Sequence, residues 1–285
     1  MHKMMWVALL GLAACPGSDD PVAITLPFNA LVNGEAANCS GEYMVGSGDR
    51  LVSLGDARIL ISGIQVQDAE GTWFDVELSV NDWQDGDVAL LDFEDGTNAC
   101  ADSGTAETNS VITGTVPEGD YSALRFDVGV PFEKNHNDSA TAPAPLNAPG
   151  MFWTWQGGYK FVRVDWVVDG DVPSRWNVHV GSTGCVSDGS TVGPEEACSN
   201  PNLSTVTLVG VDPFSDTVDI ELSELVASVD VAANTAETPP GCMSSPMEPD
   251  DCAPAYGSLG LSFDTGDCVD NCDGQRLFEA VAEAE

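Results

Sequence analysis

The chain has 285 residues, with nine Lys and Arg against 46 Asp and Glu, which gives a formal charge of −37. This balance excludes a nucleic-acid-binding protein, because phosphate contacts require clustered cations, and it disfavours binding to anionic membrane surfaces. A hydrophobic fraction of 43%, with 29 Gly and 17 Pro, indicates a folded chain with a sizeable core.

Residues 1–15 have the features of an export signal. Lys3 gives a positive start, residues 4–12 form a short apolar run, and small residues precede Cys15. The pattern predicts a bacterial lipoprotein signal whose Cys15 becomes the lipidated first residue, with a plain secretory signal as the alternative. Either signal exports the protein, and lipidation would anchor it to a membrane, facing the periplasm or the cell surface.

We expect residues 16–22 to form a tether and residues 23–285 to form a single β-rich domain. Apolar and polar residues alternate with period two in several segments, which is typical of half-buried strands. The predicted strands are 23–28, 59–66, 73–80, 111–116, 124–130, 162–168, 205–211, 218–222 and 259–263. Helical periodicity is confined to residues 275–284. The pattern predicts an all-β fold, an antiparallel β-sandwich or partly closed barrel with long disulfide-stapled loops and a short C-terminal helix.

Eight cysteines follow Cys15, and an even number in an oxidising compartment predicts four disulfides. Many pairings are possible, but three pairs are close in the chain, and these leave Cys39 with Cys100. The close pairs are Cys185 with Cys198, Cys242 with Cys252, and Cys268 with Cys272. A zinc or iron–sulfur site is disfavoured because the chain has no Cys-x-x-Cys spacing.

Acidic residues are spread along the whole chain, and most are expected on a solvated surface. One acidic loop is a candidate for calcium. Its carboxylates are those of Asp264, Asp267, Asp270 and Asp273. The loop departs from the register of an EF-hand, because Val269 and Ala280 stand where ligands are required.

Hydrolytic chemistry has little support in the sequence. A Ser or Cys nucleophile needs a His base held by an acid. The only histidines after the signal are His136 and His179, and the chain has no Gly-x-Ser-x-Gly motif. We therefore expect a protein that is not an enzyme.

The two histidines bracket a group of aromatic residues. Between them lie Trp153, Trp155, Tyr159, Trp166 and Trp176. Neutral imidazole suits copper, and two imidazole nitrogens with one further donor form a low-coordinate site that favours Cu(I) over Cu(II). The alternative is that both histidines bond to backbone groups in loops and that the tryptophans pack in the core or at its rim.

Four motifs occur in order along the chain. They are LLDFEDG at 90–96 before Cys100, VGVPF at 128–132 leading to Asn135 and His136, MFWTWQ at 151–156 with GYKF at 158–161, and HVGSTGC at 179–185. From about residue 24 to residue 278 the chain resembles the MbnP family. These are methanobactin-associated copper-binding proteins, also known as the four-Cys partner of the metallo-mystery pair.

The resemblance implies an exported β-rich protein that travels with a MauG-like di-haem peroxidase. That partner oxidises a tryptophan to kynurenine, and copper is held by two histidines and the kynurenine nitrogen. By position, His136 and His179 match the family's histidines. The candidates for the oxidised residue are Trp155 or Trp153, and then Trp176.

The family's four cysteines correspond to Cys39, Cys100, Cys185 and Cys198, and the later four are additional. The partner is required because a chain without haem cannot generate the oxidant. Taken together, the sequence predicts a copper-binding protein that is matured by a partner enzyme. The alternative function is a structural or adhesive calcium-binding surface lipoprotein.

Overall fold

The computed structural model describes residues 20–102, 104–170, 174–189 and 191–282. The predicted signal 1–15, with Cys15, and tether residues 16–19 lie outside the described residues. The first strand, β1 (Pro21–Val32), begins two residues before the expected start of the domain. Among the described residues, no helix is long and apolar enough to cross a membrane.

The larger sheet is built around the 19-residue strand β4 (Arg50–Asp68). Its main path runs β15-β10-β4-β13-β14-β17, and β3, β5 and β8 also pair with β4, while β7 pairs with β8. The other strands are β3 (Glu42–Val45), β5 (Trp73–Asp75), β7 (Gln84–Asp85), β8 (Val88–Asp92), β10 (Tyr121–Val128), β13 (Val162–Val168), β14 (Arg175–Val180), β15 (Ser204–Val209) and β17 (Gly241–Cys242).

The smaller sheet runs β18-β16-β1-β9-β6, with β2 paired to β1. Its strands besides β1 are β2 (Glu35–Ala36), β6 (Glu77–Leu78), β9 (Val111–Pro117), β16 (Thr217–Glu221) and β18 (Phe278–Val281). Most pairs are antiparallel, as the sequence predicted, but β1 with β16 and β14 with β17 are parallel. Both sheets are therefore mixed.

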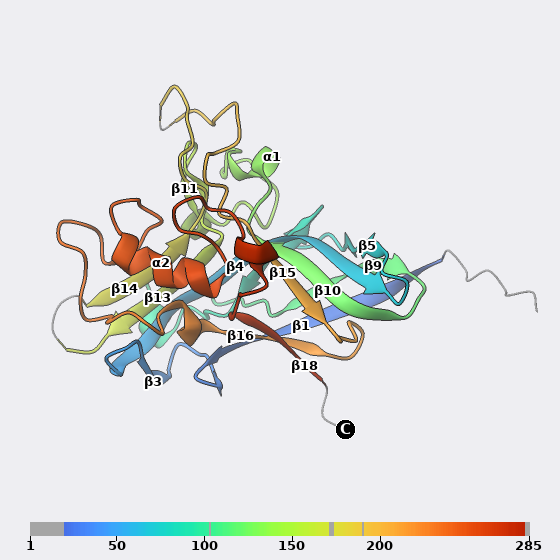
Figure 1. Cartoon of the computed structure of the whole chain (residues 1–285), viewed down its shortest axis with the longest axis horizontal. Coiled ribbons are helices and arrows are strands. Elements are labelled where there is room, and N and C mark those ends of the chain that lie inside the picture. The colour runs from blue at the N-terminus through green and yellow to red at the C-terminus, as the bar shows by residue number, and fades with distance from the viewer. Residues whose placement is uncertain (1–19, 103, 171–173, 190, 283–285) are drawn as a thin grey trace, which may run out of the picture.

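The two sheets share one main core and form a sandwich (Figure 1). Phe28 on β1 and Phe126 on β10 meet edge to face, with ring centroids 6.0 Å apart. Phe126 also meets Phe278 on β18 at 5.2 Å. Trp166 and Trp176, paired across β13 and β14, are fully buried in this core. The predicted all-β fold is confirmed, because strands from both sheets contribute alternate apolar residues to one interior.

A second layer covers the other face of the larger sheet. It consists of residues 131–161 and includes α1 (Phe132–Asn135), the 3-10 turn η2 (Pro149–Met151), and a hairpin of β11 (Phe152–Thr154) and β12 (Gly158–Tyr159). We call this segment the cover. Its buried residues Met151, Tyr159 and Leu146 pack on Leu60 and Leu90 in a small second core. In Figure 1, α1 and β11 lie in the upper part of the view.

The four predicted disulfides are present, and each joins the predicted partners. Two short helical turns carry disulfide cysteines, η1 (Asn98–Cys100) and η4 (Val269–Cys272), and a third turn, η3 (Leu222–Leu225), follows β16. The one longer helix in the described chain is α2 (Pro249–Ser258), which carries Cys252. A short helix is thus present in the C-terminal part of the chain, as predicted, but it lies before the residues that were expected to form it.

Two local predictions were wrong. Residues 275–284 were expected to be helical, but Phe278–Val281 is strand β18, because it pairs with β16 and places Phe278 in the main core. Residues 259–263 were expected to be a strand, but they follow α2, and only Leu261 forms an isolated bridge, to Cys268. In both places tertiary contacts outweigh local pattern.

Candidate metal centre

A row of charged residues crosses the larger sheet beneath the cover. The register places Asp92 of β8 opposite Arg58 of β4, Arg58 opposite Arg163 of β13, and Arg163 opposite His179 of β14. Strand neighbours at i and i+2 share a face. Asp165 therefore lies on the same face of β13 as Arg163. Trp166, which packs in the main core, lies on the opposite face of this strand.

His179 is buried, and its Nε2 lies 2.6 Å from Oδ1 of Asp165. Burial alone would raise the pKa of Asp165, but the bond from His179 and the charge of Arg163 lower it to about 2. The carboxylate is therefore ionised and can only accept, so Nε2 of His179 donates. Burial lowers the pKa of His179 more than Asp165 raises it. The imidazole is thus neutral at pH 7, and its Nδ1 carries the lone pair.

Arg163 joins several buried groups. Its Nη2 is 3.0 Å from Oδ2 of Asp165, and its Nε is 3.1 Å from Oδ2 of Asp56. Asp56 is fully buried and also accepts two bonds from Arg58, at 2.9 and 2.6 Å. Buried charges are tolerated when they are paired in this way. The carboxylate of Asp165, which accepts from His179, is therefore held in place by Arg163, and Arg163 is held in turn by Asp56.

The same charged residues hold the cover. The carbonyl oxygen of Gly150 accepts from Nη1 of Arg163 at 3.1 Å and from Nζ of Lys160 at 2.8 Å. Burial, and then the charge of Arg163, lowers the pKa of Lys160 to about 8. Gly150 stands two residues before β11, so Arg163 connects the strand that carries Trp153 to the side chain of His179 through Asp165.

His136 directly follows α1 in the cover and is buried. Its Nδ1 lies 3.0 Å from the carbonyl oxygen of Trp155, and its Nε2 lies 3.3 Å from the amide nitrogen of Asn135. A carbonyl can only accept, so Nδ1 donates and Nε2 carries the lone pair. Burial lowers the pKa of His136, which favours this neutral form.

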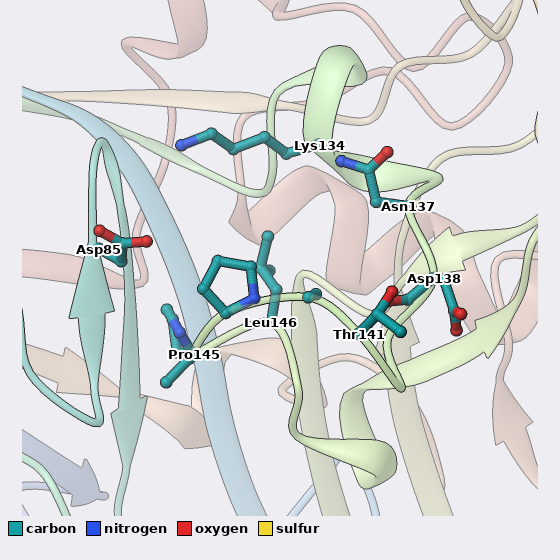
Figure 2. A pocket seen from close by; sticks show the side chains of 10 residues that line it. Asp85, Lys134, Asn137, Asp138, Thr141, Pro145 and Leu146 are labelled. Atoms are coloured by element: carbon teal, nitrogen blue, oxygen red, sulfur yellow. The ribbon is translucent and has the colours of Figure 1, made fainter.

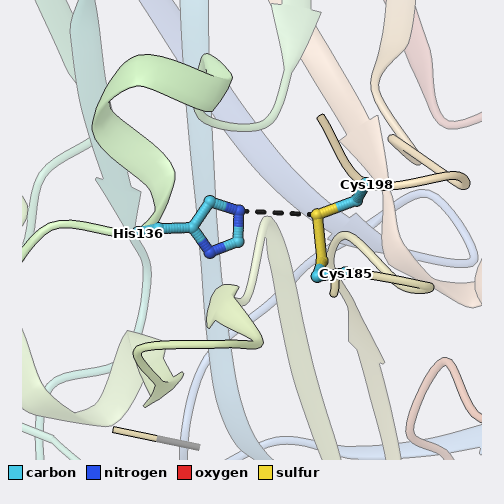
Figure 3. A group of neighbouring side chains, drawn as sticks. All are labelled: His136, Cys185 and Cys198. Atoms are coloured by element: carbon cyan, nitrogen blue, oxygen red, sulfur yellow. Dashed lines mark hydrogen bonds between the residues drawn. A yellow bond between two sulfur atoms is a disulfide. The ribbon is translucent and has the colours of Figure 1, made fainter. Parts of the chain in front are cut away.

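The Cys185–Cys198 disulfide lies beside His136 (Figure 3). Sγ of Cys198 is 3.5 Å from Nε2 of His136, and the nitrogen and both sulfurs lie within 4.8 Å of one another. This is the one group of three metal-ligating side chains found among the described residues. Because the sulfurs are bonded to each other, they are not thiolates, and the imidazole nitrogen is the strong donor of the three.

Asn135 connects the surroundings of the two histidines. Its amide nitrogen donates to Oγ of Ser182 at 3.1 Å, and its oxygen accepts from the backbone nitrogen of Tyr159 at 2.8 Å. Ser182 lies three residues after His179. The chain just beyond His179 is thus bonded, through one hydroxyl, to the buried amide that neighbours His136.

The three candidate tryptophans occupy different environments. The ring of Trp153 is half-buried, with its centroid 6.4 Å from that of His179. Trp155 contacts His136 through its backbone oxygen. Trp176 is 1% exposed in the main core, on the face of β14 opposite His179. Trp153 is the candidate whose ring contacts a candidate ligand.

The carboxylates of the acidic loop do not assemble into a group of three within ligand reach, as far as the described part of the chain shows. A separate cavity of about 450 Å³ lies beside α1, between Lys134, Asp85, Asp138 and Leu146 (Figure 2). Lys134 also pairs with Asp87. None of the candidate copper residues lines this cavity, so it is separate from the histidines.

Sequence reasoning missed Asp165, Arg163 and Asn135. A signal was present in Val-Arg-Val-Asp-Trp at 162–166, where two charged residues alternate with apolar ones. That alternation is usual for a strand with one face in water. Here the second face is buried under the cover, and the charges bond to one another and to His179.

Comparison with known proteins decides the family. The sequence model of the MbnP family matches residues 21–244. The solved structure of MbnP from Methylosinus trichosporium is similar, with a TM-score of 0.80 and 32% identity, over 93% of this chain and 100% of that one. The chain belongs to the MbnP family. No curated protein matches it.

Membership in the MbnP family confirms the resemblance predicted from the four motifs. Three of these motifs meet at one place, because α1 with His136, the β11–β12 hairpin and the end of β14 are in contact. The fourth motif, at 90–96, includes Asp92, which stands at the far end of the charged row. In this MbnP family chain, three of the four sequence motifs therefore form one structural region around the two histidines.

Proposed function

We propose that this MbnP family protein binds copper through Nε2 of His136 and Nδ1 of His179. Membership in a family of methanobactin-associated copper proteins supports copper as the metal. The observation that carries the assignment is that each imidazole has one nitrogen bonded to an acceptor, which leaves a lone pair on the other. Metal-bound histidines have this arrangement, in which a carboxylate or carbonyl fixes the tautomer.

The donor set suits Cu(I). Both proposed donors are neutral nitrogens, and both rings are buried, so a weakly hydrated monovalent ion meets little competition from water. The carboxylate nearest to His179 is occupied by its bonds to that ring and to Arg163. It is therefore placed to orient a ligand.

We propose Trp153 as the source of a third donor, in place of Trp155, which the sequence names first with Trp153 as its alternative. Intact indole offers no lone pair to a metal, whereas kynurenine has an aryl amine. Conversion breaks the C2–C3 bond of the indole ring and places one oxygen atom on each of these carbons, with peroxide as the oxidant that is reduced to water. Water then hydrolyses the resulting N-formyl group and releases C2 as formate. A MauG-like di-haem peroxidase supplies the oxidising equivalents for this step, because the residues of this chain carry no group that could generate them. The ring contact between Trp153 and His179 supports the choice.

In this proposal the protein is the substrate of its partner and a carrier of copper. It is not itself an enzyme, in agreement with the general character of the family. Four disulfides support an exported protein. We further propose that Cys15 is lipidated and holds the domain at a membrane, with copper handling as its role outside the cytoplasm.

A competition titration with a Cu(I) chelator tests the ligands. We expect one tightly bound copper in the matured protein, and a large loss of affinity in His136→Ala and in His179→Ala. Asn177→Ala is the control, because Asn177 lies on the same face of β14, two residues before His179. If both histidine variants bind copper as tightly as the parent, the proposed site is wrong.

Peptide mass mapping tests the modification. Protein from the native host should carry, at Trp153, the mass change of one added oxygen and one lost carbon, and protein made without the peroxidase should not. Trp153→Phe should remove the near-ultraviolet absorption of kynurenine, and the matched Trp155→Phe should retain it. Unmodified tryptophan at 153 in matured protein would exclude this residue.

A further inference from the structure

A depression of about 340 Å³ lies on the surface over Trp153. Its walls come from the β11–β12 hairpin, from residues 182–185 and from residues 243–246. Ser182 bonds to Asn135, and the sulfur of Cys185 is within 4.8 Å of a ring nitrogen of His136. The depression is therefore bordered by residues that neighbour both proposed ligands, since Trp153 in its lining also contacts the ring of His179.

The lining of this depression has no charged residue, although the chain carries 46 Asp and Glu. Calcium and magnesium require carboxylate or other hard oxygen ligands, and these walls offer only hydroxyl, amide and backbone oxygens. Two side chains of the lining contain sulfur, Cys185 and Met243. Cys185 is in a disulfide, so the thioether of Met243 is the soft metal ligand of the lining. Thioether sulfur selects Cu(I).

The fold holds Met243 beside His179. β17 pairs in parallel with β14, with Gly241 opposite Asn177 and Cys242 opposite Val178. Met243 and His179 are the next residues along these two paired segments. Beyond the strand, Oγ of Ser244 donates to the carbonyl oxygen of His179 at 2.9 Å and accepts from the nitrogen of Gly181 at 3.3 Å.

The loop that carries Met243 is also held by contacts with α2 and with the residue before that helix. The Cys242–Cys252 disulfide ties its start to α2, and the backbone nitrogen of Met243 donates to Oε2 of buried Glu248 at 2.9 Å. The backbone at Met243 is thus fixed, while the side chain is half-buried at the wall of the depression. A soft donor is thus held at the wall of the depression, on the segment that pairs beside His179.

We propose that the depression is the route by which Cu(I) reaches the histidines, and that the thioether of Met243 binds the ion on the way. This inference rests on the proposed copper function and adds an uptake site to it. Because Met243 acts before the ion is seated, its loss should slow loading and leave the final affinity unchanged. The absence of carboxylates from the walls would keep hard cations out.

Stopped-flow transfer from a Cu(I)–bicinchoninate complex tests the proposal on the full-length matured protein. Met243→Leu keeps the volume of the side chain and removes the sulfur. We expect several-fold slower loading with unchanged equilibrium affinity. Met247→Leu, in the same loop at 71% exposure, and Met44→Leu, on β3 at 48% exposure, should load like the parent. Equal rates for parent and Met243→Leu, or an equal slowing in Met247→Leu, would overturn the role of Met243.

A second measurement separates this site from the histidine site. Silver(I), a non-redox substitute for Cu(I), is titrated into protein labelled with ¹³C at the methionine methyl groups and carrying both His136→Ala and His179→Ala. We expect the Met243 methyl resonance to shift while that of Met44 does not. No shift at Met243 overturns the uptake site. Parent protein that binds copper independently of either histidine overturns the proposed function instead.

Discussion

Asp165 determines which nitrogen of His179 is available. A carboxylate on the distal nitrogen of a metal-bound imidazole raises the basicity of the ligand and fixes its orientation. Asp165→Asn removes the charge with little change of shape. We expect copper affinity to fall by about 10- to 100-fold, measured by chelator competition.

Asp127→Asn is the matched control for that change. Asp127 is a half-buried carboxylate on β10 that bonds to Thr205, away from the histidines. It should leave copper affinity unaltered. An Asp165→Asn protein with the affinity of the parent would show that Asp165 serves folding alone.

Asp92 makes stability depend on pH. Burial, opposed by Arg58 and reinforced by Glu94, raises its pKa to about 7, against about 3.9 when unfolded. Between these values the folded state binds the extra proton. This group therefore stabilises the fold fully below about pH 4, and that contribution is lost as pH rises to about 7.

Asp92→Asn should remove this dependence. Relative to the parent, the free energy of unfolding of the variant should rise from pH 5 to pH 8 by about 3 kcal/mol, because about two pKa units of the shift lie between pH 5 and the folded value of about 7, at roughly 1.4 kcal/mol per unit. Denaturant unfolding at the two pH values measures the difference. If the free energy of unfolding of the variant differs from that of the parent by the same amount at both pH values, the assignment to Asp92 is contradicted.

The two histidines that we propose as ligands were candidates from the sequence, whereas the residues that bond to them in the structure were not. His136 and His179 were identifiable because histidine is rare in this chain. Asp165 and Arg163 were indistinguishable from surface charges, since the segment that covers them, residues 131–161, has too little regular structure for pattern to place it.

The β11–β12 hairpin is positioned by close contact with Gly181. A Cβ at this position would lie 2.5 Å from the carbonyl oxygen of Tyr159 and 2.6 Å from the ring of Trp153. Gly181→Ala should therefore displace the hairpin. Overpacking of this kind costs about 1–3 kcal/mol.

Thermal unfolding and copper affinity should both be lowered in Gly181→Ala. Gly257→Ala in α2 is the control, because a Cβ there meets no atom within 4 Å. If Gly181→Ala melts and binds copper like the parent, the hairpin tolerates a shift and the contact does not set the position of Trp153.

Strands with strict alternation were predictable as elements, and β13 matches its predicted bounds. β18 was not, because its apolar residues fit a helix as well as a strand, and the decision comes from pairing with β16 and from the contact of Phe278 with Phe126. The short strands of the cover and β17 are too short to show an alternation of apolar and polar residues, and they are held in place by their neighbours.

At the scale of the molecule, the disulfides constrain loops of very different length. Their partners are 61, 13, 10 and 4 residues apart in the chain. In the chain-entropy description, longer loops give more stability, about 4 kcal/mol for the longest and about 2 kcal/mol for the shortest. The Cys39–Cys100 bond should matter most.

Paired Cys→Ser variants test this order by denaturant unfolding. Loss of Cys39–Cys100 should lower the free energy of unfolding more than loss of Cys268–Cys272. The reverse order would show that local packing around the short loop, and not the freedom of the unfolded chain, sets its contribution.

The two proposed ligands belong to different layers: His136 is in the cover and His179 is in the sheet. A copper ion held by both would be a mechanical cross-link between a small outer layer and a large rigid one. Loss of the ion would then leave the sheet intact and remove one of the links that hold the cover, beside the bonds to Gly150 and Asn135, so that the loaded and empty proteins differ in the local opening of residues 131–161. Any protein that receives copper from this chain could distinguish the two states by how easily that layer moves.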